Sequence, residues 1–333
     1  MADYTTIDDS SAYFQTTLYT GNGGTQSITN TGNSDLQPDW IWIKARNEAE
    51  HHNLIDSVRG NTKVVYSSLS GAEDTTSIQV TGFASDGFAL GSGTNTNKNN
   101  ITYAAWQWKE TADAGFDIVT YSGSSASSKT VSHNLSAVPK MILVKCRSAG
   151  ENWAVYHHTL GNTHALFLNT DGASSDTPVF ADTTPTSSVF SVNADDRTGA
   201  NGKTYVAYVF AEKQGYSKFG SYVGNGNANG TFIYTGFKPA FFLQKKSSAA
   251  GNYWNMWGYT SASGSNPIGR RLFPNVNAVE SNQDGSPMAD FCSNGVKLRQ
   301  TDSDYNGSGA TYIYMAFAEN PFVTSTGVPA TAR

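Results

Sequence analysis

The chain has 333 residues, enough for two or three domains of ordinary size. Only 15% of the residues are charged and the formal net charge is −5, so the composition gives no cationic footprint for nucleic acid. Aromatic residues make up 12% of a chain with 32 glycines, which is typical of short strands joined by tight turns, and the 38% of hydrophobic residues excludes general disorder.

The two ends of the chain are interpreted as short extensions. Residues 1–13 are polar and acidic and lack the basic and apolar regions of a secretory signal, so we expect an N-terminal arm. Residues 324–333 are expected to form a C-terminal tail. No stretch approaches the about 18 apolar residues of a membrane-spanning helix, so we expect no membrane insertion. Cys146 and Cys292 are too few for a disulfide framework, and we expect both to be reduced and buried.

Between these ends the sequence repeats itself at intervals of about 100 residues. The landmarks are a Tyr-x-Gly turn, a proline followed six residues later by a lysine, a tryptophan segment, a Gly-centred hairpin and a Thr-Tyr strand. The first copy has HHNLIDSVRG in place of the tryptophan segment, and the second copy has only a degraded hairpin, VFSVNA. Such ordered recurrence predicts an internal triplication. The positions are Tyr19, Tyr121 and Tyr222; Pro38, Pro139 and Pro239 with Lys44, Lys145 and Lys245; Trp153 and Trp254; residues 83–90 and 291–298; and Thr102, Thr204 and Thr311.

Each copy is typical of an all-β unit. Apolar runs of five to eight residues, rich in β-branched and aromatic side chains, are separated by Gly, Asn, Asp, Ser and Pro. The segments after the three prolines are apolar on both faces, which indicates central strands, and each proline suits a strand start. In TYIYMAFAE, alternation puts the even-numbered residues from Tyr312 on one face and the odd-numbered ones on the other. We therefore expect three tandem antiparallel β-sandwich repeats, of jelly-roll or lectin-like form, at residues 14–112, 113–214 and 215–323.

A catalytic site would have to come from isolated polar residues. His51 and His52 precede Asp56, Ser57 and Arg59, but no Gly-x-Ser-x-Gly elbow surrounds the serine. We interpret this segment as a polar loop with an internal Asp56–Arg59 contact, and we expect no enzymatic activity.

Two further groups of titratable residues are interpreted as structural. His157 and His158, at the related place in the second copy, have no carboxylate or cysteine at ligand spacing, so a loop is favoured over a metal site. The lysine pair at 245–246 and the arginine pair at 270–271 are interpreted as solvated strand ends rather than a nucleic-acid stripe.

The stretch TDSDYNGSG is a weak candidate for a calcium site. Asp302, Asp304 and Asn306 match the first half of a calcium loop, but Ile313 stands where that loop needs a bidentate glutamate. We favour a turn stabilised by the Asp and Asn side chains and expect no cofactor, with a calcium ion between loops as the alternative.

The richest local group of aromatic residues is the candidate for receptor contact. Trp254 matches Trp153 of the second copy and is expected to pack in the core. Tyr253, Trp257 and Tyr259 stand beside Asn and Ser, as aromatic residues that stack on sugar rings do, and are the candidate glycan-binding residues. The second-copy counterparts of Trp257 and Tyr259 are taken to be His158 and Leu160.

Several longer segments of the sequence are familiar from one group of proteins. These segments include LYTGNGGTQSI, QPDWIWIKAR, HNLSAVPKMILVKCR, NWAVYHHTLG, NGKTYVAYVFAEKQGYSKFGSYVGNG and GSGATYIYMAFAENPF. With them, the chain from about residue 14 to about residue 322 resembles proteins encoded by tailed phages of marine bacteria, cyanophages in particular. Such proteins are described as tail-fibre-like or uncharacterised virion proteins, some with lectin-like sandwich domains. The resemblance carries over no catalytic residue and implies a structural or adhesive virion component.

The function that this resemblance favours is that of a tail-fibre or tail-tip adhesin that contributes to attachment to host-surface glycans. The alternative is a capsid decoration protein or another non-adhesive virion subunit. The expected location is the virion, assembled in the host cytoplasm. The expected partners are other virion subunits, with a homotrimer favoured by analogy with phage fibres. The chain has neither heptads nor a short β-helix repeat, so no fibre shaft is predicted.

Overall fold

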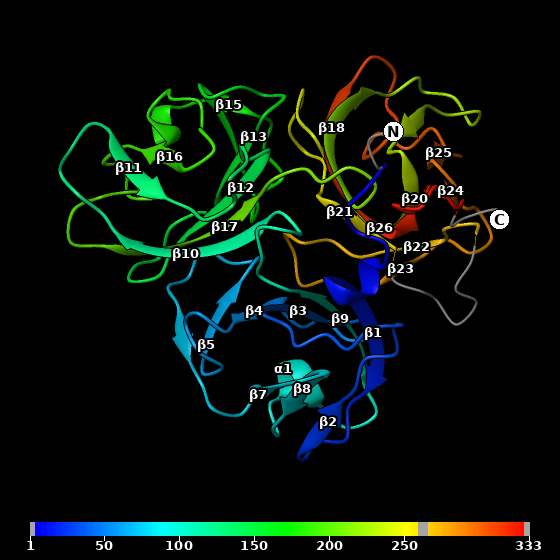
Figure 1. Ribbon diagram of the computed structural model, residues 1–333, viewed down its shortest axis with the longest axis horizontal. Coiled ribbons are helices and arrows are strands. Elements are labelled where there is room, and N and C mark those ends of the chain that lie inside the picture. Colours follow the sequence, from blue (N-terminus) through cyan, green and yellow to red (C-terminus); the bar gives the residue numbers. More distant parts are fainter. Residues whose placement is uncertain (1–3, 259–265, 330–333) are drawn as a thin grey trace.

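The computed structural model describes residues 4–258 and 266–329. Antiparallel strands make up nearly all of its regular structure, which confirms the predicted all-β class. Figure 1 shows the strands as three lobes around a common centre, and we call them the first (β1–β9), second (β10–β17) and third (β18–β26) strand sets. The short helices are η1 (Ser10–Ala12), α1 (Thr94–Asn97) and η2 (Pro178–Phe180). No helix in the described ranges is long and apolar enough to cross a membrane.

Each strand set contributes one large sheet with the same strand order at its start. The first strand of the set pairs with its last strand, which pairs in turn with the long strand of the proline landmark. The first set has β1 (Phe14–Thr20), β9 (Thr102–Trp108), β3 (Trp40–Ala45), β4 (Asn53–Asp56), β5 (Lys63–Tyr66) and β6 (Asp74–Thr75). The second has β10 (Phe116–Ser122), β17 (Thr204–Phe210), β12 (Met141–Cys146), β13 (Ala154–His157), β14 (His164–Phe167) and β15 (Ser175–Asp176). The third has β18 (Ser217–Val223), β26 (Thr311–Pro321), β20 (Phe237–Lys246) and β21 (Asn255–Trp257).

A smaller sheet covers one face of each large sheet. In the first set it holds β2 (Gln26–Ile28), β8 (Gly87–Leu90) and β7 (Val80–Ala84). In the second set it holds β11 (Lys129–Ser132) and β16 (Val189–Val192). In the third set it holds β19 (Phe232–Tyr234), β25 (Gly295–Leu298) and β24 (Ala289–Cys292), and β22 (Arg270–Arg271) pairs with β23 (Ser281–Asn282) nearby. The recurring order supports the division at 14–112, 113–214 and 215–323, which stays a prediction.

The Tyr-x-Gly and Thr-Tyr landmarks recur because they hold the same loop in each set. Tyr103 stacks on Tyr19 with ring centroids 5.1 Å apart, and the corresponding separations in the other sets are 5.2 and 4.9 Å. The Tyr103 hydroxyl donates to the Thr94 carbonyl and accepts from the Lys98 N–H. Tyr205 and Tyr312 each make both of these hydrogen bonds at the matching positions.

The other face of each large sheet contributes to one core shared by all three sets. Alternation along β26 sends Ile313, Met315 and Phe317 into this shared core, and Tyr312 and Tyr314 into the core of the third set, as predicted. Aromatic rings meet across every boundary between sets. The pairs are Trp40 with Tyr208 (4.4 Å), Trp108 with Phe241 (5.6 Å) and Phe210 with Phe317 (6.1 Å).

One hydrogen bond at the rim of the shared core recurs at each boundary. Trp153 Nε1 donates to the Tyr66 carbonyl of the first set, and Trp254 Nε1 donates to the Phe167 carbonyl of the second. In the first set, His52 takes this place, with its Nε2 3.0 Å from the Phe273 carbonyl oxygen. Trp42 Nε1 donates to His52 Nδ1, so Nε2 carries the proton and donates. The histidine thereby replaces the tryptophan that the first copy lacks.

Backbone hydrogen bonds follow the same cyclic order. The amides of Glu73, Ser174 and Glu280 donate to the carbonyls of Arg147, Ser247 and Arg46, over 2.8, 2.9 and 2.7 Å. Two of these three contacts also carry an ion pair, between Arg147 and Glu73 and between Arg46 and Glu280. Each lobe is therefore fastened to both of its neighbours.

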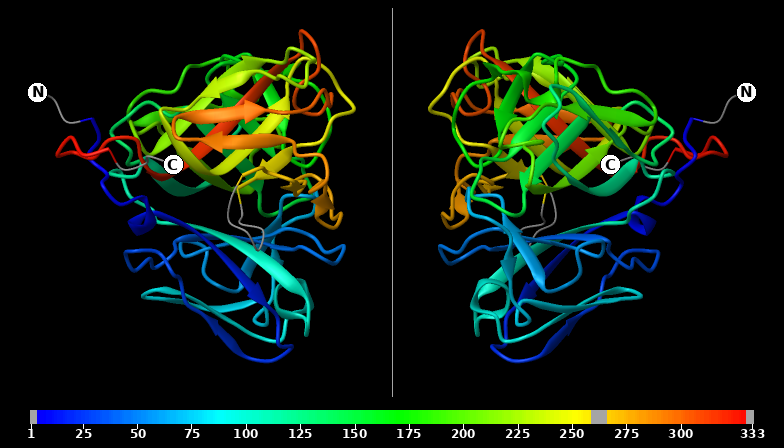
Figure 2. Two further views of the ribbon diagram at one scale, coloured as in Figure 1. Left: turned by 90° about the vertical axis from the view of Figure 1, so that its right-hand side faces the viewer. Right: turned by 90° about the vertical axis from the view of Figure 1, so that its left-hand side faces the viewer.

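The N-terminal arm does not stand apart from the sandwiches. Ile7 is buried in the shared core, and the Tyr4 hydroxyl donates to the Gly236 carbonyl of the third set. Asp8 accepts hydrogen bonds from Ser325, so the segments before and after the three sets lie side by side (Figure 2).

Several sequence-based expectations need correction. Pro239 does not start its strand: β20 begins at Phe237, and its register shifts at Pro239, where a residue without an N–H fits a bulge. Lys245 and Arg271 are buried rather than solvated, because each has polar partners inside the fold. Cys146 is buried as expected, whereas Cys292 is only half-buried, and both thiols are free.

Candidate functional site

The aromatic residues proposed for glycan contact lie in different environments. Trp257 is fully buried, stacked on Phe242 at 5.7 Å and edge-on to Tyr305, so its assignment to glycan contact was wrong. Trp257 pairs with Phe242 as Tyr156 pairs with Ile142, so its counterpart is Tyr156 and not His158. A buried tyrosine at the matching place indicates a core position.

The aromatic neighbours of Trp257 also differ in their exposure. Trp254 is buried in the shared core, as predicted. Tyr253 keeps 44% of its surface exposed and packs edge-on against Phe273. Tyr259 lies outside the described residues.

The three candidate calcium ligands are occupied by protein partners. Arg271 forms ion pairs with Asp302 (3.3 Å) and Asp304 (3.2 Å), so a guanidinium lies where a cation would bind. Asn306 accepts from the Asn225 N–H through its Oδ1, and its amide nitrogen donates to the Gln300 carbonyl among other partners. In the described part of the chain, no three His, Cys, Asp or Glu side chains come together in a group that could hold a metal ion.

The polar segment after the first histidine pair does not converge on one point. His51 Nδ1 contacts the Ser68 hydroxyl, whereas the Ser57 hydroxyl donates to Asp39. Asp56 instead forms a buried ion pair with Arg59 at 2.5 Å, the internal contact expected from the sequence.

That ion pair belongs to the boundary between the first and second sets. Arg59 also pairs with Glu73 at 2.9 Å, and its guanidinium donates to the Tyr208 hydroxyl, which donates to Asp56. The partners hold the pKa of Arg59 above its usual value despite burial, and they hold the pKa of Glu73 below its own. This network joins two lobes, which is a structural task.

The second histidine pair also has structural partners. His157 Nε2 lies 3.2 Å from the Tyr314 carbonyl oxygen, and His158 Nε2 lies 3.1 Å from that of Phe219. Burial lowers the pKa of His157 to about 3, so this ring is neutral at physiological pH. Both rings therefore serve the contact between the second and third sets.

The outer face of the small sheet of the third set carries exposed aromatic rings. On β19, Phe232 and Tyr234 point outward with 44% and 61% of their surface exposed, while Ile233 between them is buried. Lys297 and Asp290 follow Phe232 across the sheet, and Gly295 and Cys292 follow Tyr234. We call this surface, formed by Phe232, Tyr234, Asp290, Cys292, Gly295 and Lys297, the aromatic face.

The same two outward positions hold hydroxyl residues in the other sets. Ile28 pairs with Phe88, Val131 with Phe190 and Ile233 with Val296, which aligns the three strands. The residues that flank Ile28 are Ser27 and Thr29, and those that flank Val131 are Thr130 and Ser132, all of them exposed. The fold therefore does not need aromatic rings at these positions.

Gly295 leaves room for the tip of the Phe232 ring. A Cβ at Gly295 would come within 2.7 Å of Phe232 Cζ, and within 2.3 Å of the Ile233 carbonyl oxygen. Any side chain there would displace the ring. At the other end of the face, a Cβ at Gly236 would lie 3.2 Å from the Tyr4 hydroxyl and 3.6 Å from the Tyr234 hydroxyl. The N-terminal arm thus adds Tyr4, a third aromatic ring and a second phenol, beside Tyr234.

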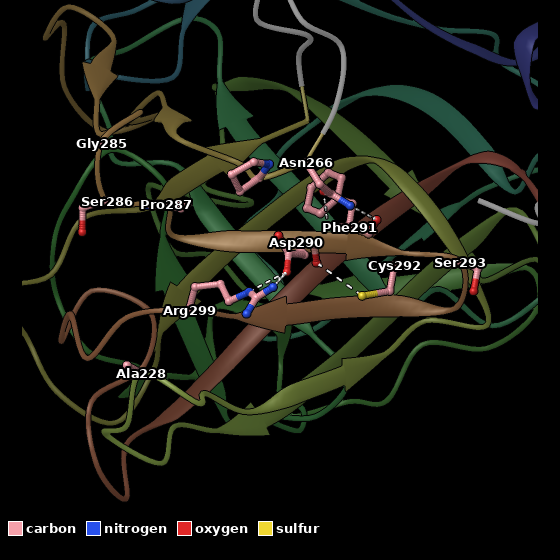
Figure 3. A pocket seen from close by; sticks show the side chains of 11 residues that line it. Ala228, Asn266, Gly285, Ser286, Pro287, Asp290, Phe291, Cys292, Ser293 and Arg299 are labelled. Carbon is pink, nitrogen blue, oxygen red and sulfur yellow. Dashed lines mark hydrogen bonds and ion pairs between the residues drawn. The ribbon is translucent and has the colours of Figure 1, made fainter.

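An open depression of about 910 Å³ borders the aromatic face. Figure 3 shows Asp290, Cys292 and Arg299 projecting toward it from β24 and from the segment that follows β25. Asp290 and Arg299 form an ion pair, and Ala228, from the loop before β19, lines the same depression. Burial raises the pKa of the Cys292 thiol, so the thiol stays protonated near neutral pH.

The sequence analysis missed Phe232 and Tyr234, although a signal for them is present. The segment TFIYTG of the third copy aligns with KTVSHN of the second, and the comparison puts two aromatic residues where the second copy has Thr and Ser. The densest local group of aromatic residues in the sequence is the tryptophan segment instead, where the rings are mostly buried.

A family model described as a domain of unknown function (DUF7483) matches residues 9–321, which include all three strand sets and the aromatic face. No curated protein matches the chain, and no solved structure matches it.

Proposed function

The chain belongs to the DUF7483 family, a domain of unknown function, and we propose that it is a phage virion structural protein that acts as a tail-fibre or tail-tip adhesin. Two features support the proposal. One is the resemblance of its landmark segments to phage virion proteins. The other is a rigid body of three lobes fastened around one core, which suits a load-carrying particle component.

The observation that carries the adhesive role is the exposure of Phe232 and Tyr234 on the aromatic face. Exposed rings beside polar side chains are the usual means by which proteins hold sugar rings and other amphipathic ligands. The rings are unnecessary for the fold, because Thr130 and Ser132 stand at the same places in the second set. A role in contact with another molecule accounts for them.

The alternative proposal is a capsid decoration or other non-adhesive subunit. The full burial of Trp257 favours this alternative over glycan contact by the tryptophan-rich segment, because that segment packs in the interior of the lobe. In this alternative, the aromatic face would be covered by a neighbouring virion subunit, and other virion proteins are partners in either case.

A binding assay on host cells tests the adhesive role. We expect fluorescently labelled protein to bind host cells saturably and non-host cells weakly. The variant Phe232→Thr with Tyr234→Ser, which carries the residues of the second set, is expected to lose tenfold or more of its apparent affinity, roughly the effect of removing two anchoring aromatic residues.

The matched control is Thr130→Ala with Ser132→Ala at the equivalent positions of the second set, which should bind as the unaltered protein does. If the unaltered protein ignores host cells but binds capsids that lack it, the adhesive role is wrong and the decoration role stands.

A further inference from the structure

We propose that the aromatic face binds a neutral pyranose glycan, at one site per chain. The inference rests on the proposed attachment function and names the ligand of that same site. It draws on the ring geometry of β19, on the charges that surround the rings and on the comparison among the three strand sets.

The ring geometry suits an extended chain of sugars. Phe232 and Tyr234 are two residues apart on one strand, so their attachment points lie about 6.6 Å apart along it. The Phe232 ring reaches over Gly295, where a Cβ would come within 2.7 Å of Phe232 Cζ, and 44% of the Phe232 surface and 61% of the Tyr234 surface are exposed. Two exposed rings at this spacing can each stack on the C–H face of a successive pyranose.

The charges beside the rings favour a neutral ligand. The Arg299 guanidinium is paired with the Asp290 carboxylate, and the Lys297 ammonium donates to the Gly230 carbonyl. A carboxylated or sulfated sugar would meet the Asp290 carboxylate and would have to compete for cations that already have partners. Sugar hydroxyls, in contrast, can donate to Asp290 and accept from Arg299 without breaking the ion pair.

The depression beside the face supplies room for a ligand longer than one sugar. It extends from Ala228 past Asp290 and Arg299 to Ser293, and its volume is about 910 Å³ (Figure 3). Ser286 and Ser293 line it as well, so the floor offers hydroxyls and charged groups while the rings lie on β19. This division, with stacking on one side and hydrogen bonds on the other, is that of a saccharide site.

The comparison among the sets limits the site to one per chain. Ser27 and Thr29 in the first set, and Thr130 and Ser132 in the second, offer no ring for stacking. The second set also lacks a third strand in its small sheet, so nothing there corresponds to β24 with Asp290. We therefore expect a stoichiometry of one and not three.

Titration calorimetry on the full chain tests the inference. The probes are hexasaccharides of glucose, mannose and galactose in several linkages, together with a hexamer of galacturonic acid as the anionic probe. We expect at least one neutral hexasaccharide to bind with a stoichiometry near one, and the galacturonic acid hexamer to bind at least tenfold more weakly.

Two variants locate the site. Phe232→Thr with Tyr234→Ser should raise the dissociation constant by about tenfold or more. Thr130→Ala with Ser132→Ala should leave it unchanged. If the first variant folds poorly, saturation-transfer NMR on the unaltered protein tests the same aromatic contact. Saturation transfer to the sugar C–H protons should then be lost when the tyrosine and phenylalanine residues are deuterated.

The outcomes separate this inference from the proposed function. Binding of none of the neutral probes, a stoichiometry of three, or stronger binding of the anionic hexamer would overturn the inference even when the protein attaches to host cells through Phe232 and Tyr234. Neutral-glycan binding at this face without attachment to cells would leave the inference standing and overturn the adhesive role.

Discussion

Three lysines that recur at one place of the repeat are buried in the fold. Lys44, Lys145 and Lys245 have no exposed surface, and each ammonium donates to the carbonyl of the next residue, Ala45, Cys146 or Lys246. Lys145 also donates to Ser70 and Lys245 to Asp171, which tie them to the neighbouring set. Burial lowers the pKa of all three lysines to about 8. In the second and third sets, the landmark lysine is thus a link between lobes, whereas Lys44 bonds within the first set.

These lysines should contribute a gain in stability as the pH rises from about 8 toward 9.5. Their folded pKa lies below the value of 10.5 for an unburied lysine, so the unfolded chain binds more protons at these groups in this window. Between pH 7.5 and 9.5, we expect each lysine to add about 1–2 kcal/mol to the free energy of unfolding in urea. The buried tyrosines, whose pKa is raised by burial, act in the opposite direction as the pH approaches 10, so the measurement stops at pH 9.5. Burial, with a hydrogen bond to Asp117, raises the pKa of Glu110 to about 7, so its proton is lost below this window.

The variant Lys145→Met isolates the contribution of one lysine. It removes hydrogen bonds and lowers stability at every pH, so the informative quantity is the slope with pH, which should fall by about a third. Lys109→Met, at an exposed lysine, should keep the full slope. An unchanged slope in Lys145→Met would contradict the assignment.

At the scale of the element, the landmark tyrosines hold the loop that precedes the last strand of each set against the large sheet. The Tyr205 hydroxyl donates to the Asp196 carbonyl at 3.0 Å and accepts from the Ala200 N–H at 2.9 Å. Beside it, the Tyr121 hydroxyl donates to the Thr198 carbonyl. The Asn, Asp and Gly residues of these loops form the turn, and the two phenols satisfy its buried backbone groups.

The variant Tyr205→Phe should lower the free energy of unfolding by about 0.5–1.5 kcal/mol, because the Ala200 N–H loses one of its two acceptors and the Asp196 carbonyl loses a donor. Hydrogen exchange should show faster exchange of the Ala200 amide. Tyr66→Phe, which removes a phenol at an exposed contact with Asp74, should change stability by less than about 0.5 kcal/mol. Equal losses in the two variants would show that the loop hydrogen bonds add nothing specific.

The elements that could be predicted are those whose pattern is local. Alternation placed both faces of β26 correctly, and the repeated Thr-Tyr and Tyr-x-Gly segments marked paired strands. Other features depend on partners from distant sequence. The burial of Trp257 depends on Phe242 and Tyr305, and the neutralisation of Asp302 depends on Arg271. Phe232 and Tyr234 are recognised as candidate site residues most clearly when strand pairing aligns the three sets.

At the scale of the whole molecule, the lobes are not independent domains. The shared core takes rings from each set, including Trp40, Tyr208 and Phe317, and all of these are buried. A lobe alone would expose one entire apolar face of its large sheet to water. Burial of large apolar side chains is the main source of stability, so each lobe depends on the other two.

We therefore expect one cooperative unfolding transition, in which far-ultraviolet circular dichroism and tryptophan fluorescence change together. A fragment of residues 113–214 should be unfolded or aggregated, because Trp153, Tyr208 and Phe210 would lose their neighbours. A fragment with dispersed NMR signals and a sharp melting transition would contradict the shared-core account. Light scattering on the full chain would show whether the predicted homotrimer adds a further level of assembly to the 35.7 kDa chain.

Because the three lobes belong to one polypeptide, they can also change independently by mutation. In a trimer of identical chains, a single codon change appears three times, so any residue must suit all three places at once. Within this chain, a codon change alters only one of the three lobes. His52 could take over from a tryptophan at one boundary while Trp153 and Trp254 kept the other two, and Phe232 and Tyr234 could arise on a single lobe. The surface of one lobe can thus change while the other two lobes preserve the shape of the body.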